Sequence, residues 1–247
     1  MPICAKLKSL FKKTPYHSRL LWTISKKGAL KIFRITNMHI VKPSILLLLC
    51  LFFVVLCGCS NQSRLDLLKY KNNVLENRSQ KNQFFKFSED SPIPVTERWQ
   101  FTELQYFPVD TDYQVQANYY PLPVKEELTI QTSSGQPRVY VKIGYFEFVL
   151  FDKKLKLMAY QEKSWLARSA EMPLFVPFSD ETTGRSTYGA GRYLDVKIPQ
   201  SDTAVLDFNY AYNPYCSYSS TYSCPIPPPE NRLPVKIEAG EKNYTKI

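Results

Sequence analysis

Carboxylate, amide, tyrosine and arginine side chains gather in the last third of the sequence and are the groups that could bind or transform a ligand. The polar side chains lie among tyrosines and near a proline-rich run, a combination that suits a pocket for a carbohydrate or another polar ligand. The candidate binding residues are Asp180, Tyr188, Arg192, Asp207, Asn209, Asn213, Glu230 and Asn231, and tyrosines such as Tyr210, Tyr212 and Tyr215 would supply stacking faces.

Arg192 has two interpretations. Its guanidinium could pair with Asp180, Asp195 or Asp207 through two parallel hydrogen bonds, a geometry that also recognises an anionic ligand. Alternatively, the arginine belongs to a buried polar network that fixes the ends of strands, since structural ion pairs perturb charges as active sites do. Burial with complete hydrogen bonding would favour the structural interpretation.

Asp207 and Glu230 could form a catalytic pair. If their carboxyl groups are about 5–9.5 Å apart, one could act as the acid and the other as the base in glycoside hydrolysis. The alternative function is therefore a carboxylate-dependent hydrolase acting on envelope glycans or another polar substrate. In the simpler interpretation, the asparagines bond the backbone of turns and the tyrosines cover the core. The sequence lacks EF-hand spacing, and we expect no metal and no cofactor.

Histidine is absent after position 59, because His17 and His39 both come earlier. Without an imidazole in that part of the chain, Ser-His-Asp and Cys-His nucleophiles are excluded there. The cysteines beyond position 59 are Cys216 and Cys224, and this pair predicts one disulfide in an oxidising compartment. A tetrahedral zinc site would need four ligands, and these two cysteines supply half of them.

The formal net charge of +10 does not indicate a nucleic-acid-binding protein. Residues 1–59 contain ten of the 32 basic residues and none of the 22 acidic ones, so the rest of the chain is formally neutral. Because that remainder has no excess of positive charge, we expect no nucleic-acid partner.

The residues before position 59 have the layout of a secretory signal. A short basic stretch begins at Met38, and the apolar run 45–56 follows it. This run is shorter than the roughly 20 residues that a membrane-spanning helix needs. We therefore expect a signal peptide at residues 38–58. Residues 1–37 would then be an extension ahead of a start at Met38, or part of an unusually long basic leader.

Residues Leu56, Cys57, Gly58 and Cys59 resemble the lipobox of bacterial lipoprotein precursors, which consists of Leu, a small residue, Gly or Ala, and the lipidated Cys. The resemblance implies cleavage before Cys59 and acylation of that cysteine, which would make the membrane a partner through a lipid anchor. The alternative is an uncleaved signal anchor. Ser60, in place of Asp, implies the periplasmic face of the outer membrane over the inner membrane.

Beyond the signal, the sequence predicts a tether or helix followed by one β-rich domain. We expect the tether or helix at residues 59–91, because about 62–82 are polar and tolerate a helix, and Pro92 and Pro94 then interrupt the pattern. Residues 92–247 contain short alternating runs separated by turn residues, which indicates a mainly β fold, either a single β-sandwich or a partly closed barrel. The expected strands are 113–119, 127–132, 138–151, 155–161, 193–198, 204–208 and 235–238.

Several stretches of the C-terminal half resemble the bacterial and archaeal domain-of-unknown-function family numbered 1684. They are residues 174–184, 187–195, 206–216 and 224–234, and the resemblance extends over roughly residues 101–242. It implies membership of that family without an established activity, cofactor or substrate. We therefore expect a lipid-anchored cell-envelope protein that acts as a binding or structural module, with a polar or glycan ligand.

Overall fold

The computed structural model describes residues 43–166 and 172–245, with side chains described from Gln62 onward except that of Trp165. The chain divides into two compact units, Met1–Val54 and Val55–Ile247. The predicted extension at 1–37 lies outside the described residues, as do positions 38–42 of the predicted signal peptide. The apolar run and Cys59 fall within the first helix, in a part where the backbone alone is described.

Helix α1 (Pro43–Phe87) precedes the β-rich domain, as the sequence predicts. Val74, Arg78 and Phe85 are buried, and their spacing places them on one face of the helix. Leu65 and Leu68, which precede Val74 on the helix, remain exposed. In the described part of the chain, no helix has the length and apolar character needed to cross a membrane.

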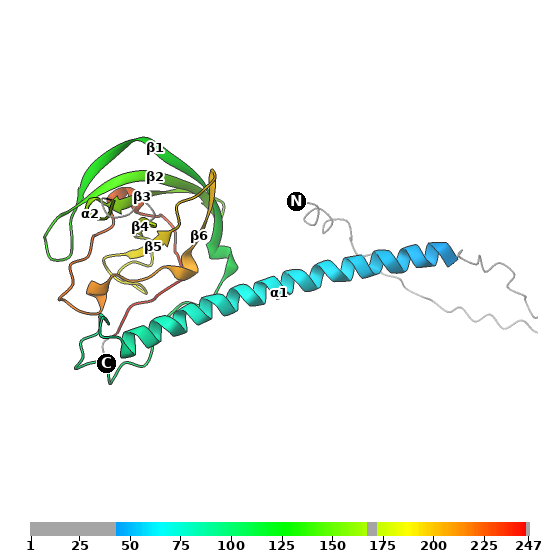
Figure 1. The fold of residues 1–247 in the computed structure, drawn as a ribbon, viewed down its shortest axis with the longest axis horizontal. Helices are drawn as coiled ribbons and strands as arrows, with labels where there is room; N and C mark the ends of the chain where they lie inside the picture. Colours follow the sequence, from blue (N-terminus) through cyan, green and yellow to red (C-terminus); the bar gives the residue numbers. More distant parts are fainter. Residues whose placement is uncertain (1–42, 167–171, 246–247) are drawn as a thin grey trace, which may run out of the picture. The chain divides into compact units, whose positions relative to one another are not determined.

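Six antiparallel strands form one curled sheet in the order β5-β4-β3-β2-β1-β6 (Figure 1). The mainly β prediction is confirmed, in the form of a partly closed barrel. Shifts in register between Pro121 and Glu126, and between Lys142 and Gly144, bend the long strands. The strands are β1 (Gln114–Ile130), β2 (Arg138–Leu150), β3 (Lys153–Glu162), β4 (Leu174–Phe178), β5 (Arg192–Val196) and β6 (Thr203–Asp207).

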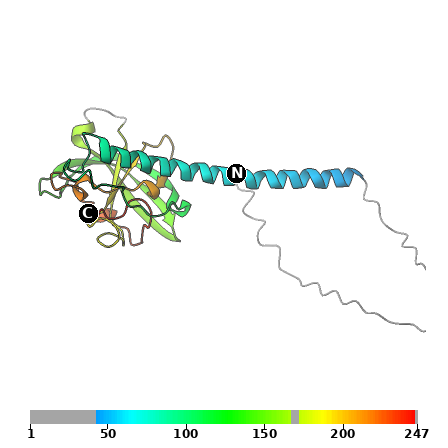
Figure 2. The same cartoon turned by 90° about the horizontal axis from the view of Figure 1, so that it is seen from below.

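The core fills the inner side of the curled sheet. Alternate residues of the strands point inward, and inner-face side chains such as Phe146, Leu157 and Val176 are fully buried. The C-terminal segment adds Leu233 and Ile237 to the same core. Figure 2, turned by 90°, shows the last turns of α1 lying along the β-rich domain.

Three of the predicted strands differ from the observed ones. The runs 113–119 and 127–132 both belong to β1, because a register shift joins them where a turn was expected. Residues 235–238 do not form a strand. The N–H of Ile237 donates to the carboxylate of Asp180, and its carbonyl accepts from the guanidinium of Arg192. These side chains occupy the backbone groups that a neighbouring strand would otherwise bond.

Candidate functional site

Arg192 pairs with Asp180, one of its three predicted partners, inside the core. Nη2 of Arg192 lies 3.5 Å from Oδ1 of Asp180, and both side chains are fully buried. Arg192 begins β5 on the face that points inward, in step with Leu194 and Val196. Burial lowers the pKa of the guanidinium, and the charge of Asp180 acts in the opposite direction.

The same pair holds the C-terminal segment. Nη2 of Arg192 donates to the carbonyl of Ile237 at 2.8 Å, and Nη1 donates to the carbonyls of Ala239 and Glu241. Oδ2 of Asp180 accepts from the N–H of Ile237 at 2.7 Å. Because the guanidinium and the carboxylate bond backbone groups of one segment, the structure favours the structural interpretation of both residues.

A second buried carboxylate, Glu241, joins α1 to the β-rich domain and was not among the predicted binding residues. Its Oε1 lies 2.5 Å from Nζ of Lys81. Its Oε2 accepts from the N–H of Asn213 at 2.8 Å and from the hydroxyl of Tyr218 at 2.6 Å. The amide of Asn213 donates to the carbonyl of Lys242 at 2.8 Å. Asn213 thus belongs to the network that attaches the helix.

Asp207 and Asn209 form a third network with Tyr70 of α1. The Tyr70 hydroxyl donates to Oδ2 of Asp207 at 2.8 Å, and Asp207 also accepts from the N–H of Asn209 at 3.0 Å. The Asn209 amide donates to the carbonyl of Asp110 at 2.7 Å. Burial and the hydrogen bond to Asp207 raise the pKa of Tyr70. These bonds fix the turn after β6 against the helix.

Glu230 and Asn231 lie in the short helix η4 (Pro229–Asn231). Glu230 accepts from the hydroxyl of Tyr160 at 2.6 Å and pairs with Lys142 at 3.2 Å. Burial opposes ionisation of Glu230, but the hydrogen bonds from Tyr160 and Lys142 outweigh it and lower the pKa. The buried Asn231 bonds both the N–H and the carbonyl of Met158, at 2.7 and 2.9 Å.

Asp207 and Glu230, the predicted acid and base, therefore sit in different networks. Within the described ranges they share no hydrogen-bond partner and line no common hollow. A glycosidase pair would need both carboxyl groups to face one substrate. No observation at these two residues favours the carboxylate-dependent hydrolase.

A different set of side chains converges on a pocket at the outer face of the sheet. In β5, Arg192 and Leu194 point into the core, so Tyr193 and Asp195 point the other way. The pocket has a volume of about 560 Å³, within the range of about 300–1,000 Å³ of small-molecule sites. We call it the Tyr212 pocket, and its aromatic lining residues are Tyr140, Phe175, Tyr193, Tyr212, Tyr215 and Tyr222.

The aromatic rings form a connected wall. Tyr140 stacks on Phe175 with 5.6 Å between ring centroids. Phe175 meets the edge of Tyr193 at 4.7 Å, and Tyr193 meets Tyr212 at 5.7 Å. These separations suit favourable aromatic pairs, so the rings hold one another in place. Tyr140 and Tyr193 are buried within the wall, so its accessible surface comes from the partly exposed Phe175 and Tyr212.

Two of the three named stacking tyrosines line the Tyr212 pocket, and the third lies outside it. Tyr212 and Tyr215 line the pocket, and Tyr215 contacts Tyr222 at 5.2 Å between centroids. Tyr210 lies in another hollow. Part of the predicted tyrosine set thus lines this pocket, whereas none of the eight candidate binding residues predicted with it does.

Asp195 is the carboxylate of β5 that faces the pocket. Its Oδ2 accepts a hydrogen bond of 2.8 Å from the hydroxyl of Tyr212. The side chain is accessible, yet the surrounding walls exclude part of the water. This desolvation raises the pKa of Asp195, although the Tyr212 hydrogen bond and the charge of Lys81 act in the opposite direction.

Three further charged side chains line the pocket, and each has a partner of opposite charge. Nη1 of Arg138 lies 3.7 Å from Oε2 of Glu162. The ammonium of Lys81 binds Glu241. In the described part of the lining, Asp195 is therefore the charged residue without an ion-pair partner.

Cys216 and Cys224 lie side by side as free thiols, and Cys224 lines the pocket. The N–H of Cys216 donates to Sγ of Cys224 at 3.2 Å, and the hydroxyl of Tyr188 is 3.6 Å from Sγ of Cys216. The hydrogen bond from the Cys224 thiol lowers the pKa of Cys216 to about 6, and the same contact raises the pKa of Cys224. The disulfide stays a prediction, which this proximity supports.

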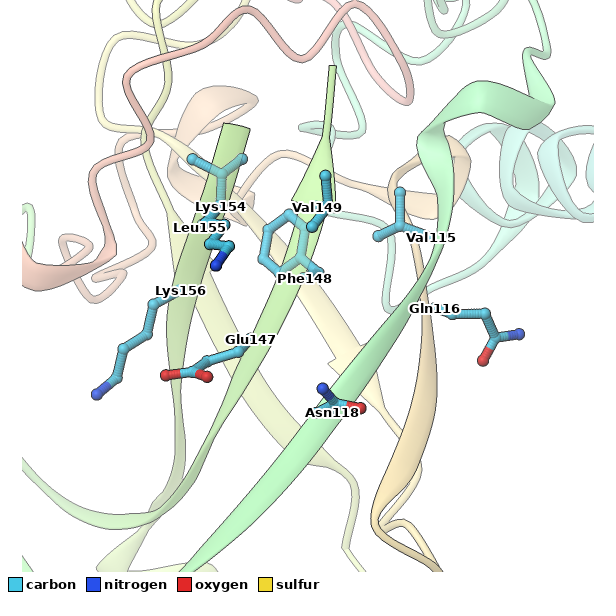
Figure 3. A pocket seen from close by; sticks show the side chains of 9 residues that line it. All are labelled: Val115, Gln116, Asn118, Glu147, Phe148, Val149, Lys154, Leu155 and Lys156. Atoms are coloured by element: carbon cyan, nitrogen blue, oxygen red, sulfur yellow. The ribbon is translucent and has the colours of Figure 1, made fainter. Parts of the chain in front are cut away.

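A hollow of about 660 Å³ on β1, β2 and β3 has a different character. Its polar lining residues include Gln116, Asn118, Glu147 and Lys156. Figure 3 shows that the ends of these side chains point in different directions and do not meet at one position. A ligand site requires a few convergent polar groups, so this hollow is the weaker candidate.

The residues of the Tyr212 pocket could be predicted from the sequence only in part. Asp195 was considered as a partner of Arg192. Side chains alternate along β5, so if Arg192 points inward, Asp195 must point outward. This alternation is the signal that could have placed Asp195 on the outer face. Lys81 and Glu162 had no such signal, because they come from α1 and β3, far apart in the chain.

Comparisons with known proteins identify a family and a similar structure, and neither has a stated activity. A family model described as a protein of unknown function, DUF1684, matches residues 99–242. An uncharacterized protein of Haloarcula marismortui, solved by NMR in solution, is 36% identical with a TM-score of 0.57, and the match covers 72% of this chain and 96% of that one. No curated protein matches the chain.

Proposed function

The chain belongs to the DUF1684 family of proteins of unknown function, and we propose that this member is a lipid-anchored protein of the cell envelope. In this proposal, its β-rich domain binds a small ligand in the Tyr212 pocket. The anchor is Cys59, and the location is the periplasmic face of the outer membrane.

The anchor is supported by the order of the residues before Cys59. A basic stretch, the apolar run 45–56 and the residues Leu56, Cys57 and Gly58 follow one another as in a lipoprotein signal. Several acyl chains, each adding about 0.8 kcal/mol per buried methylene, would hold the mature protein on a membrane durably.

The single observation that carries the binding function is the convergence in the Tyr212 pocket. An aromatic wall from several strands and a later loop surrounds one accessible carboxylate, Asp195, whose orientation is fixed by Tyr212. Apolar pockets with a few oriented polar groups are typical of ligand sites.

Lipidation is tested by changing neighbouring cysteines. In a bacterial host, the wild-type chain should lose residues 1–58 and gain an acyl mass. Cys59→Ser should give an unprocessed precursor without acyl mass, whereas Cys57→Ser, two residues away, should be processed normally. An acylated Cys59→Ser variant would contradict the anchor.

Ligand binding is tested with a neutral aromatic probe, benzamide, by equilibrium dialysis of the full chain in detergent. Tyr215→Ala removes one face of the pocket and should weaken benzamide binding about threefold to tenfold. Tyr210→Ala is the matched control, because Tyr210 and Tyr215 are both 37% exposed and Tyr210 lies outside the pocket. Equal binding by both variants and the wild type would contradict the pocket's function.

A further inference from the structure

We propose that the Tyr212 pocket recognises the ammonium group of a small organic cation. The inference rests on the proposed function of the pocket as a ligand site and specifies the chemical class of its ligand. It follows from the charge balance of the lining and from the arrangement of its rings.

The charge balance leaves one negative charge for a ligand. Arg138 and Glu162 neutralise each other at 3.7 Å, and Lys81 is neutralised by Glu241 at 2.5 Å. Asp195 accepts a hydrogen bond from the Tyr212 hydroxyl, and it feels the charge of Lys81, whose ammonium makes its ion pair with Glu241. An incoming cation would supply the missing opposite charge.

The rings provide the second half of a cation site. Faces of aromatic rings attract cations when the charge lies within about 6 Å of the ring centroid. Tyr193 lies on the same face of β5 as Asp195 but is only 5% exposed, and the partly exposed Tyr212, from the loop after β6, contacts its edge. The pocket already contains one such contact, because Nζ of Lys81 lies 4.9 Å from the centroid of Tyr212. A second cation beside Asp195 would meet the carboxylate and the more accessible rings of the lining, such as Phe175 and Tyr215.

Other ligand classes fit the lining less well. An anion would meet Asp195 without a free basic group, since Lys81 and Arg138 are both engaged. A neutral sugar could stack on the tyrosines, but it would leave the charge of Asp195 uncompensated. The volume of about 560 Å³ leaves room for a body larger than the ammonium group itself.

The test compares choline with 3,3-dimethylbutan-1-ol, its neutral isostere of the same shape, by titration calorimetry of the full chain in detergent. Choline should bind about tenfold more tightly than the isostere. Asp195→Asn keeps the size of the side chain and should remove this preference. Asp202→Asn, at an exposed position outside the pocket, should keep it. Near-ultraviolet circular dichroism checks that each variant is folded.

Equal binding of choline and its isostere, the absence of choline binding, or an unchanged preference in Asp195→Asn would each overturn the cation inference. The ligand-binding function is decided separately by the benzamide comparison of Tyr215→Ala with Tyr210→Ala. The cation inference can therefore fail while the pocket remains a ligand site. If benzamide binding is also unaffected by Tyr215→Ala, both proposals fail.

Discussion

The hydroxyl of Tyr212 donates a 2.8 Å hydrogen bond to Oδ2 of Asp195, on the outer face of the sheet. The bond comes from the loop after β6 and reaches a side chain of β5 at the other edge of the sheet order. Because the ring of Tyr212 also packs against Tyr193, the carboxylate is oriented by a residue that is itself held in place. Asp195 is thus presented to the pocket in a fixed position.

The affinity for a cation should fall on acidification. Burial raises the pKa of Asp195 above its ordinary value of 3.8, with Lys81 and Tyr212 opposing the shift. Ionised Asp195 attracts the ligand, so binding should be constant at neutral pH and decrease as the pH falls through the raised pKa. Lys81, Arg138 and Glu162 are the other charged groups of the pocket. Choline titrations at several pH values measure this profile, and Asp195→Asn should lack the step that Asp195 causes.

Asp180→Asn should destabilise the fold strongly. The change leaves the buried guanidinium of Arg192 without its counter-charge, and breaking a buried pair in this way costs about 3–5 kcal/mol. Urea unfolding, followed by tyrosine fluorescence, gives the free energy of unfolding. The control Asp202→Asn lies at an exposed position and should change that free energy by less than about 0.5 kcal/mol. Equal stability of the two variants would contradict the structural role of the pair.

Glu241→Gln should loosen α1 from the β-rich domain. Glu241 is 1% exposed and accepts bonds from Lys81, Asn213 and Tyr218. Loss of its charge should cost about 1–3 kcal/mol and make residues 62–87 more sensitive to limited proteolysis. Glu76→Gln changes an exposed glutamate of the same helix and should leave the cleavage rate unchanged. Similar cleavage of both variants would argue against the attachment.

Cys216 and Cys224 should form a disulfide when the protein matures outside the cytoplasm. Their contact and the lowered pKa of Cys216 favour thiolate formation, the first step of oxidation. Intact mass with thiol labelling, before and after reduction, should show two additional labelled thiols only after reduction. Labelling of both cysteines without a reductant would refute the disulfide in the mature protein.

Much of the fold could be predicted from the sequence, because its signals are local. Alternation of apolar and polar residues predicted strands at 138–151 and 155–161, which correspond to β2 and β3. The segment 235–238 also alternates, but it is not a strand. Its backbone is bonded by Arg192 and Asp180, which are distant in sequence, so no local pattern could reveal this.

The candidate site was less predictable for a related reason. The polar residues predicted to form it are of types that often bond the backbone of turns and helix caps, and several do so in the structure. The amide of Asn209 donates to the carbonyl of Asp110, and the amide of Asn231 donates to the carbonyl of Met158. The pocket draws its parts from α1, four strands and the loop after β6. Only the sheet order brings Arg138 and Asp195 to one face.

Saturation-transfer NMR tests the central claim most directly, because it reports which protein groups lie against a bound ligand. Saturation of the tyrosine ring protons should pass to the methyl protons of choline in the wild-type chain. It should be lost in Asp195→Asn and retained in Asp202→Asn. That result would place an organic cation among the rings beside Asp195. Transfer of equal strength in Asp195→Asn, or no transfer in the wild type, would contradict the assignment of the Tyr212 pocket to a cationic ligand.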